Sequence, residues 1–313
     1  MTEATVESVE TLLRDELAQG DVMISTATPI LRHLLVNEDQ ALFSDEVVAR
    51  VRGMVTDVAR QLLHAQAEAA VIVDRAAFLA EREEELAAAL IDDPAFLGHV
   101  HALTLEAKLA LQLQARCAID AVLSPLLQEL VASKDDVLAG SAMAVIAAQA
   151  RFVQHHRRMS LSLGELPGEL FHKALLALRS QAGEGDEASA AAESALRDAY
   201  DEAHSRLGLL SRLIMRMGKA APRTLDLDNA GVAMFATALA MATDQDRGLT
   251  VVSFSDRQFA RLALALRAAG LKQPAVEEQF LFLHPGVSLP EGFDKLSADR
   301  ASLLLASSAP QGL

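Results

Sequence analysis

Apolar residues recur at helical spacing along most of the 313-residue chain. The clearest run follows Ser44, where apolar residues stand three or four positions apart at Val47, Val51, Met54, Val58 and Leu62. This spacing places them on one face of a long helix, and such a face must be buried against other elements. Similar patterns predict a helix that begins near Asp135 and further helices over 189–217, 229–243, 256–269 and 274–283.

Prolines mark the expected helix starts. A proline in the first turn of a helix loses no needed N–H, and Thr, Asp and Ser are good N-caps just before it. Five of the nine prolines stand where a helix is expected to begin: Pro29, Pro94, Pro125, Pro167 and Pro274.

Three stretches share a plan in which one helix ends on a leucine, a short acidic turn follows, and a second helix begins. Their leucines, Leu35, Leu90 and Leu130, are 55 and 40 residues apart, whereas a regular solenoid keeps its period. The expected fold class is therefore all-α, as an irregular array of helical hairpins that is either HEAT-like or a multi-helix bundle.

Composition divides this expected array into two subdomains. Residues 181–190 are rich in Gly, Ser and acid and lack an apolar stripe, which predicts a flexible linker. The linker would separate an N-terminal helical domain, 1–180, from a C-terminal one, 191–285, and residues 286–313 would form a loosely ordered tail. The run LTVVSF, 249–254, is a candidate for one short strand.

Amino-acid usage agrees with a helical protein. The hydrophobic fraction is 51%, but the chain has only 11 Phe, one Tyr and no Trp, which favours close-packed helices over sheets. The formal net charge of −15 lacks the basic excess that nucleic-acid binding requires. We therefore expect no nucleic-acid partner.

The sequence also lacks the usual membrane and export signals. The first twenty residues hold neither the basic nor the apolar region of a signal peptide, and the longest charge-free runs, 137–150 and 229–243, are shorter than the roughly 20 residues of a membrane span. The single cysteine, Cys117, cannot form an internal disulfide. A cytoplasmic protein without a membrane span is the expectation.

Two patterns that resemble metal sites fail on their own geometry. Residues 226–237 begin like a calcium loop, but Ala230 stands where an oxygen ligand is needed and Thr237 stands where a bidentate glutamate is needed. His99 and His101 diverge by about 200° on a helix, so they cannot share a metal ion.

Carboxylate and histidine pairs at di-metal spacing fail as well. Glu169 with His172, and Asp201 with His204, lie beside or opposite the apolar stripes of their expected helices, so they would face water instead of a bundle core. No nucleophile motif is present either. We expect no cofactor, no metal ion and no catalytic residue.

The segment ARFVQHHRRMSLSLG, 150–164, concentrates cations near an expected helix end. The cluster consists of Arg151, His155, His156, Arg157 and Arg158. The apolar stripe runs through Phe152 toward Met159, which places His155 near the stripe and directs His156 toward solvent. The cations would then stabilise the exposed carbonyls of the helix end. The alternatives are a phosphoaccepting histidine stabilised by arginines, and a polar contact site for a partner.

A second cationic cluster lies in RLGLLSRLIMRMGKAAPR, where no acid intervenes. It consists of Arg206, Arg212, Arg216, Lys219 and Arg223. Arg212 and Arg216 share a helix face at i, i+4. A helix end whose cations complement the macrodipole is one interpretation, and a docking patch for an acidic partner is the other.

Two segments, LSPLLQELVASKDDVLAGSAMAVIAAQARFV and MSLSLGELPGELFHKALLAL, resemble a family of alphaproteobacterial helical proteins of unknown function. The resemblance covers roughly residues 30–285 and rests on Leu, Ala and turn positions. It implies a bacterial, cytoplasmic helical-repeat protein with a regulatory role, although the uneven leucine spacings depart from regular repeats. It assigns no catalytic residues.

Three functional hypotheses follow. The first is a non-enzymatic scaffold or regulator that binds a protein partner through amphipathic helices. The second is a histidine phosphotransfer protein that uses His155 or His156. The third is a helical enzyme whose site is assembled from residues distant in sequence.

We predict that the chain forms a homodimer. The runs 137–150 and 229–243 are apolar nearly all round and need burial on more than one side, which a two-layer array in one chain does not fully provide. Charge repulsion between copies is largely screened at physiological salt, where the Debye length is about 8 Å. Light scattering should give about twice the 33.4 kDa chain mass. A monomeric mass at tens of micromolar, unchanged by added salt, would contradict this.

Overall fold

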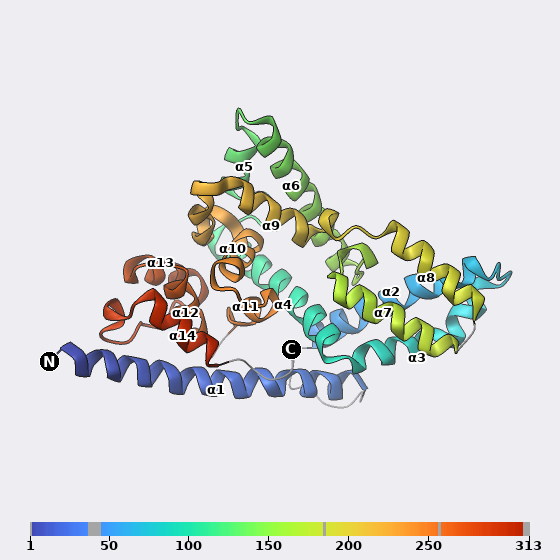
Figure 1. Ribbon diagram of the computed structural model, residues 1–313, viewed down its shortest axis with the longest axis horizontal. Helices are drawn as coiled ribbons and strands as arrows, with labels where there is room; N and C mark the ends of the chain where they lie inside the picture. The colour runs from blue at the N-terminus through green and yellow to red at the C-terminus, as the bar shows by residue number, and fades with distance from the viewer. Residues whose placement is uncertain (1, 37–44, 184–185, 256–257, 309–313) are drawn as a thin grey trace. The chain divides into compact units, whose positions relative to one another are not determined.

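A computed structural model of the chain describes residues 2–36, 45–183, 186–255 and 258–308, and throughout these ranges every regular element is helical (Figure 1). The prediction of an all-α fold is therefore confirmed. The α-helices are α1 (Thr2–Val36), α2 (Asp45–Ala69), α3 (Arg75–Asp92), α4 (Pro94–Cys117), α5 (Pro125–Val131), α6 (Asp136–Arg157), α7 (Gly168–Ala182), α8 (Glu187–Ala199), α9 (Arg206–Met217), α10 (Leu227–Thr243), α11 (Arg247–Val252), α12 (Phe259–Ala268), α13 (Gln273–Leu283) and α14 (Ala298–Ala306). Short 3₁₀ helices are η1 (Leu163–Glu165), η2 (Glu202–His204), η3 (Gly218–Leu225) and η4 (Phe293–Lys295).

The chain groups into two compact units, each built from segments that are separated in sequence. The first unit contains 1–27, 105–146 and 210–313, and the second contains 28–104 and 147–209. This division differs from the sequential one expected from composition. The expected linker, 181–190, falls inside the second unit, where 181–182 belong to α7 and 187–190 to α8, and residues 184–185 lie outside the described residues.

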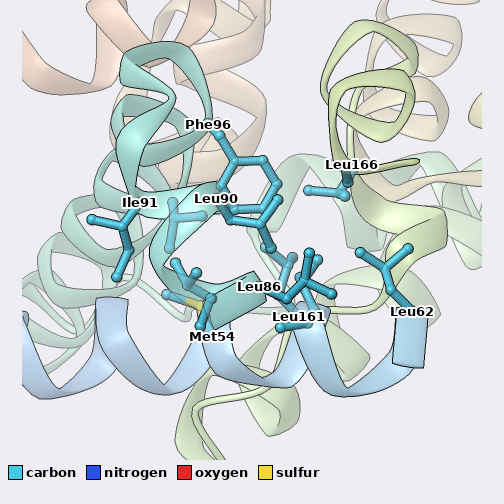
Figure 2. Packing of buried hydrophobic residues seen from close by; sticks show 14 of the residues in the cluster. Met54, Leu62, Leu86, Leu90, Ile91, Phe96, Leu161 and Leu166 are labelled. Carbon is cyan, nitrogen blue, oxygen red and sulfur yellow. The ribbon is translucent and has the colours of Figure 1, made fainter. Parts of the chain in front are cut away.

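The core of the second unit forms around α2. Its apolar stripe is buried as the spacing predicts, and it packs against α3, α7 and α8. Figure 2 shows side chains of this core, among them Met54 and Leu62 of α2 with Leu86, Leu90 and Phe96. Ser44, the expected start of the helix, lies outside the described residues, and α2 begins at Asp45.

The first unit forms around α10, which is buried on nearly all sides and packs against η3, α5, α11 and α12. The helix is interrupted at Gly231, where φ is 73° and a Cβ would lie 3.2 Å from the Cβ of Ser124. Only glycine adopts that backbone conformation easily. The expected run 229–243 is thus helical and buried within its own unit.

Buried ion pairs also hold the first unit together. Glu106 of α4, only 1% exposed, accepts hydrogen bonds of 2.9 and 3.0 Å from both guanidinium nitrogens of Arg247. Arg261 of α12, also 1% exposed, bonds Asp21 of α1 and the carbonyl of Ser308. Removing one partner from such a pair leaves an uncompensated buried charge, which is strongly destabilising.

Several local expectations are wrong. Pro29 lies inside α1 instead of starting a helix, and residues 249–254, the candidate strand, fall largely within α11. The single helix expected over 189–217 is divided into α8, η2 and α9. The division lies at residues 200–205, and Gly208, in the first turn of α9, approaches the carbonyl oxygen of Glu202 so closely that a Cβ there would lie only 2.4 Å from it.

The other prolines and the C-terminal segment give mixed outcomes. Pro94, Pro125 and Pro274 stand in the first turn of α4, α5 and α13 as expected, and Pro167 is the residue just before α7. Within the expected loose tail, α14 packs on α12 and buries Leu304 and Leu305. That part of the tail is therefore ordered.

One described helix, α6, is long and apolar enough to cross a membrane. Its most apolar 18-residue window has a mean hydropathy of 1.3, and 22% of that window is buried. Length and composition are the only grounds for this assignment. The expectation of no membrane span stays a prediction.

The end of α6 meets α2 at a glycine. A Cβ added to Gly53 would lie 2.6 Å from the Cβ of Met159. The two segments of the chain therefore approach too closely for a side chain at position 53. Gly140 is also inside a helix, α6, but no atom lies within 4 Å of the position that its Cβ would take.

We predict that Gly53→Ala lowers the free energy of unfolding by about 1–2 kcal/mol. Overpacking costs about 1–3 kcal/mol, and the better helix propensity of alanine offsets about 0.5–1 kcal/mol of it. Gly140→Ala is the matched control, and it should stabilise the protein by about 0.5–1 kcal/mol because only the propensity changes. Urea denaturation of both variants measures this. Equal effects from the two substitutions would show that Gly53 is not a point of close approach.

Candidate functional site: two cationic surfaces

The structure separates the two cationic clusters found in the sequence. Arg151, His155, His156, Arg157, Arg158 and Arg206 belong to the second unit. The remaining residues, Arg212, Arg216, Lys219 and Arg223, belong to the first unit. Each group is therefore described by itself.

The end of α6 is a Schellman-type cap. The N–H of Ser160 donates to the carbonyl of His155 at 2.9 Å, and the N–H of Met159 donates to the carbonyl of His156 at 3.1 Å. Met159 has φ of 54°, the left-handed conformation that this cap requires and that glycine usually supplies. The last carbonyls of the helix are thus met by backbone N–H groups, so the expected capping by Arg157 and Arg158 is not needed.

One face of α2 receives this cap and the chain that follows it. We call it the α2 docking face, and it consists of Arg50, Gly53, Asp57 and Gln61. These positions are three or four residues apart and so lie on one side of the helix. Asp57 accepts a hydrogen bond from the N–H of Leu161 at 3.0 Å, and Gln61 donates to the carbonyl of the same residue at 2.8 Å.

Arg50 fixes the last turn of α6. Its guanidinium donates to the carbonyl of His156 at 2.9 Å and lies 3.3 Å from Nδ1 of the same residue, while Glu46 binds the guanidinium at 3.0 Å. Because arginine only donates, Nδ1 of His156 is the acceptor and the proton of the neutral ring is on Nε2.

The burial of the two histidines is the reverse of the sequence expectation. His156 is 4% exposed and its ring lies 6.1 Å from that of Phe152, whereas His155 is exposed. The expectation extended the apolar stripe to Met159, but Met159 has already left the helix. The buried stripe continues from Phe152 by four residues to His156.

The ring of His155 is oriented by Ser160. Nδ1 of His155 lies 2.9 Å from the hydroxyl oxygen of Ser160, and that hydroxyl also lies 3.2 Å from the carbonyl of His155. A serine hydroxyl has one proton, and a carbonyl can only accept it. Both contacts are hydrogen bonds if Nδ1 carries the ring proton, which leaves the lone pair of His155 on Nε2.

Arg206 is not a surface cation. It is 2% exposed, its guanidinium stacks 3.7 Å above the ring of Phe152, and it donates to the side-chain carbonyl of Gln149 at 3.1 Å. The interpretation of Arg206 as part of a docking patch is therefore wrong. Its charge stabilises the packing of α6 and the start of α9 within the second unit.

A small cavity of about 20 Å³ lies between the end of α6, the segment that follows it and the start of α9. Its lining includes Phe152, His155, Ser160, Glu165 and Arg206. A cavity needs about 10–15 Å³ to hold a water molecule, whereas ligand pockets are about 300–1,000 Å³. The cavity therefore accommodates about one water.

The cations of the first unit are exposed and flank an apolar side chain. On α9, Met215 is 70% exposed beside the exposed Arg216, and Lys219 is exposed just after the helix ends at Met217. Arg212 lies one turn earlier and is half-buried. We call these four residues, Arg212, Met215, Arg216 and Lys219, the α9 surface. Sequence reasoning found the cations but did not single out Met215.

The partners of these cations differ in charge. Arg216 donates to the hydroxyl of Ser141 on α6, which leaves its positive charge uncompensated by that contact. Arg223 instead donates to Glu129 of α5 at 2.7 Å. This hydrogen bond raises the pKa of Arg223 and lowers the pKa of Glu129. Arg223 is not counted in the α9 surface, because Glu129 compensates its charge.

The second unit has two larger grooves that the sequence did not reveal. One, of about 420 Å³, lies between α3 and α7, and another, of about 760 Å³, lies between α7 and α8. The cations that line them are paired within the unit: Lys173 contacts Asp93 at 3.3 Å, and Arg179 contacts Glu193. This pairing leaves the grooves without the charge complementarity that would select a ligand.

The expected orientation of the carboxylate and histidine pairs is confirmed. Glu169, His172, Asp201 and His204 are all exposed. Nδ1 of His172 accepts a hydrogen bond from Arg197 at 2.9 Å, and His204 contacts the adjacent Asp201. In the part of the chain that the structure describes, no three His, Cys, Asp or Glu side chains converge as a metal site.

No family model, curated protein or solved structure matches this chain in the comparisons. The resemblance to the alphaproteobacterial helical family therefore stays a prediction.

We predict that His101 makes the fold acid-sensitive. Burial in α4 lowers the pKa of His101 to about 4, from an ordinary value of 6.5. The unfolded chain takes up the proton first, so the free energy of unfolding falls as the pH drops from 6.5 toward 4, by about 2 kcal/mol at pH 5.

Urea denaturation at pH 7 and at pH 5 tests this prediction. His101→Leu should lose clearly less stability between these two pH values than the wild type, because the titrating group is gone. His204→Gln is the control, since His204 is exposed, and it should behave like the wild type. The same pH dependence in the wild type and in His101→Leu would assign the acid sensitivity to other groups.

Proposed function

We propose that this protein is a non-enzymatic helical regulator or scaffold that binds a protein partner through the α9 surface. The observation that carries the proposal is Met215, which is 70% exposed and lies next to the exposed Arg216 and close in sequence to the exposed Lys219. Most of the Met215 side chain is therefore outside the packing of its own unit. It is available for contact with a partner.

The chemistry of the α9 surface favours protein recognition. Methionine is flexible and polarizable, so it fits apolar pockets of varied shape and is common at adaptable binding surfaces. Arginine is enriched among the residues that dominate binding energy, because it combines hydrogen bonding with apolar contact. Met215 and Arg216 together provide an apolar anchor and a charged neighbour.

Charge selects an acidic partner. The chain has a net charge of −15, so most of its surface repels acidic proteins. Arg216 and Lys219, both exposed, form a local positive area against this background, and such complementarity steers encounter and fixes orientation. The proposed partner is therefore a protein segment that presents carboxylates around an apolar side chain.

The test is photo-crosslinking in a lysate of the native host. A photoreactive phenylalanine derivative replaces Met215 in one sample and Leu281 in the other. Leu281 of α13 is the matched control, because it is 66% exposed but follows Glu277 and Glu278 in sequence. We expect one discrete adduct at position 215, with the crosslink mapped by mass spectrometry to an acidic segment, and no such adduct at 281.

The mapped segment is then synthesised and titrated against the full chain. Arg216→Glu with Lys219→Glu should weaken its binding by about tenfold or more, and added salt should weaken binding to the wild type. The α9 surface would be refuted as the partner site if positions 215 and 281 gave the same adducts. It would also be refuted if the double charge reversal left the affinity for the segment unchanged.

A further inference from the structure

We propose that Nε2 of His155 is a phosphorylation site that accepts a phosphoryl group from a donor of the phosphoramidate or acyl phosphate class. This site is in the second unit, and it does not depend on the partner proposed for the α9 surface. Sequence alone left two candidates, His155 and His156. Their hydrogen bonds and burial now distinguish them.

His156 fails on two counts. It is 4% exposed, so a donor has no access to its ring. Its Nδ1 accepts a hydrogen bond from Arg50 at 3.3 Å, which puts the ring proton on Nε2 and leaves that nitrogen without a lone pair for attack.

His155 meets both requirements. The residue is exposed at the end of α6, and Ser160 orients the ring through Nδ1 at 2.9 Å. Because the Ser160 hydroxyl donates to the carbonyl of His155, Nδ1 carries the proton and Nε2 carries the lone pair. Only the neutral tautomer with a lone pair on Nε2 can attack a phosphorus atom from that side of the ring.

Two arginines supply the charge that a phosphoryl group needs. Arg151 lies four residues before His155, on the same face of α6, and Arg158 lies three residues after it. Both are exposed. Charge-assisted hydrogen bonds from guanidinium groups are the strongest that proteins make to phosphoryl oxygens. Arg157 is two residues from His155 and so points about 200° away from it.

Besides the phosphoryl donor, the transfer needs only a proton from water. The Nε2 lone pair forms the new P–N bond, and the bond between phosphorus and the donor's leaving atom breaks. With phosphoramidate the leaving nitrogen takes a proton from water and departs as ammonia. The imidazole ring becomes positively charged and keeps its proton on Nδ1. Ser160 accepts that N–H as a hydrogen bond, so the ring cation is stabilised where it forms.

The experiment incubates the full chain with potassium phosphoramidate. Electron-transfer mass spectrometry locates the label among the nine histidines, and ³¹P NMR identifies the nitrogen that carries it. We expect His155 to be labelled before the other exposed histidines, with phosphorus on Nε2. His155→Asn should abolish that signal.

Three further variants test the geometry. Ser160→Ala should slow labelling of His155 by about tenfold and produce a mixture of Nδ1 and Nε2 products, because the tautomer is no longer fixed. Arg151→Gln and Arg158→Gln should each speed hydrolysis of the phosphohistidine. Arg157→Gln makes the same charge change and should leave the hydrolysis rate as in the wild type.

The results that would overturn the proposal are equally specific. Equal labelling of His155, His64, His172 and His204 would mean that exposure alone determines reactivity. Labelling of His155 on Nδ1 would contradict the tautomer. Circular dichroism of each variant confirms that its helices are retained, so that loss of label is not loss of fold.

Discussion

The packing of the α6 end onto α2 is the constraint on which the second unit depends. A helix end has several carbonyl groups without partners, and burying them unpaired would be costly. Backbone N–H groups of the cap bond the carbonyls of His155 and His156, and the α2 docking face binds the segment around the cap. Gly53 leaves room for Met159, Arg50 also donates to the carbonyl of His156, and Asp57 and Gln61 bond the backbone of the segment that follows.

This packing decides the properties of two adjacent histidines. With Met159 in the left-handed conformation, the chain turns away, and Phe152 and His156 complete the buried stripe. His155 is then exposed, and Ser160, which follows the turn, reaches back to its Nδ1. Neighbours in sequence thus receive opposite exposure and opposite ring tautomers from one helix cap, and only the exposed member has a lone pair available for chemistry.

The sequence predicted the helical class and much of the local structure, because helical periodicity and N-terminal prolines are local signals. The stripe of α2 and the first turns of α4, α5 and α13 followed from spacing and caps. The burial of His156 and the exposure of His155 could not be predicted in this way, because no sequence pattern indicates that Met159 adopts a positive φ. Methionine rarely does so, and here the space above Gly53 on a distant helix permits it.

The grouping of the chain also lay beyond sequence reasoning. Contacts such as Glu106 with Arg247, and Gln258 with the carbonyl of Gly20, join residues more than a hundred positions apart. Pairing at that distance leaves no periodic or compositional mark. The cationic residues of the two surfaces were visible in the sequence, but their separation into two units and the burial of Arg206 depend on such contacts.

The ring tautomers of His155 and His156 test this account most directly. Long-range ¹H–¹⁵N correlation NMR of the chain labelled with ¹⁵N-histidine, at about pH 8 where neutral rings dominate, reports which nitrogen holds the proton. His155→Gln and His156→Gln assign the two signals. The account predicts the proton on Nδ1 of His155 and on Nε2 of His156. The same tautomer for both residues, or the averaged pattern of a free imidazole at His155, would contradict it.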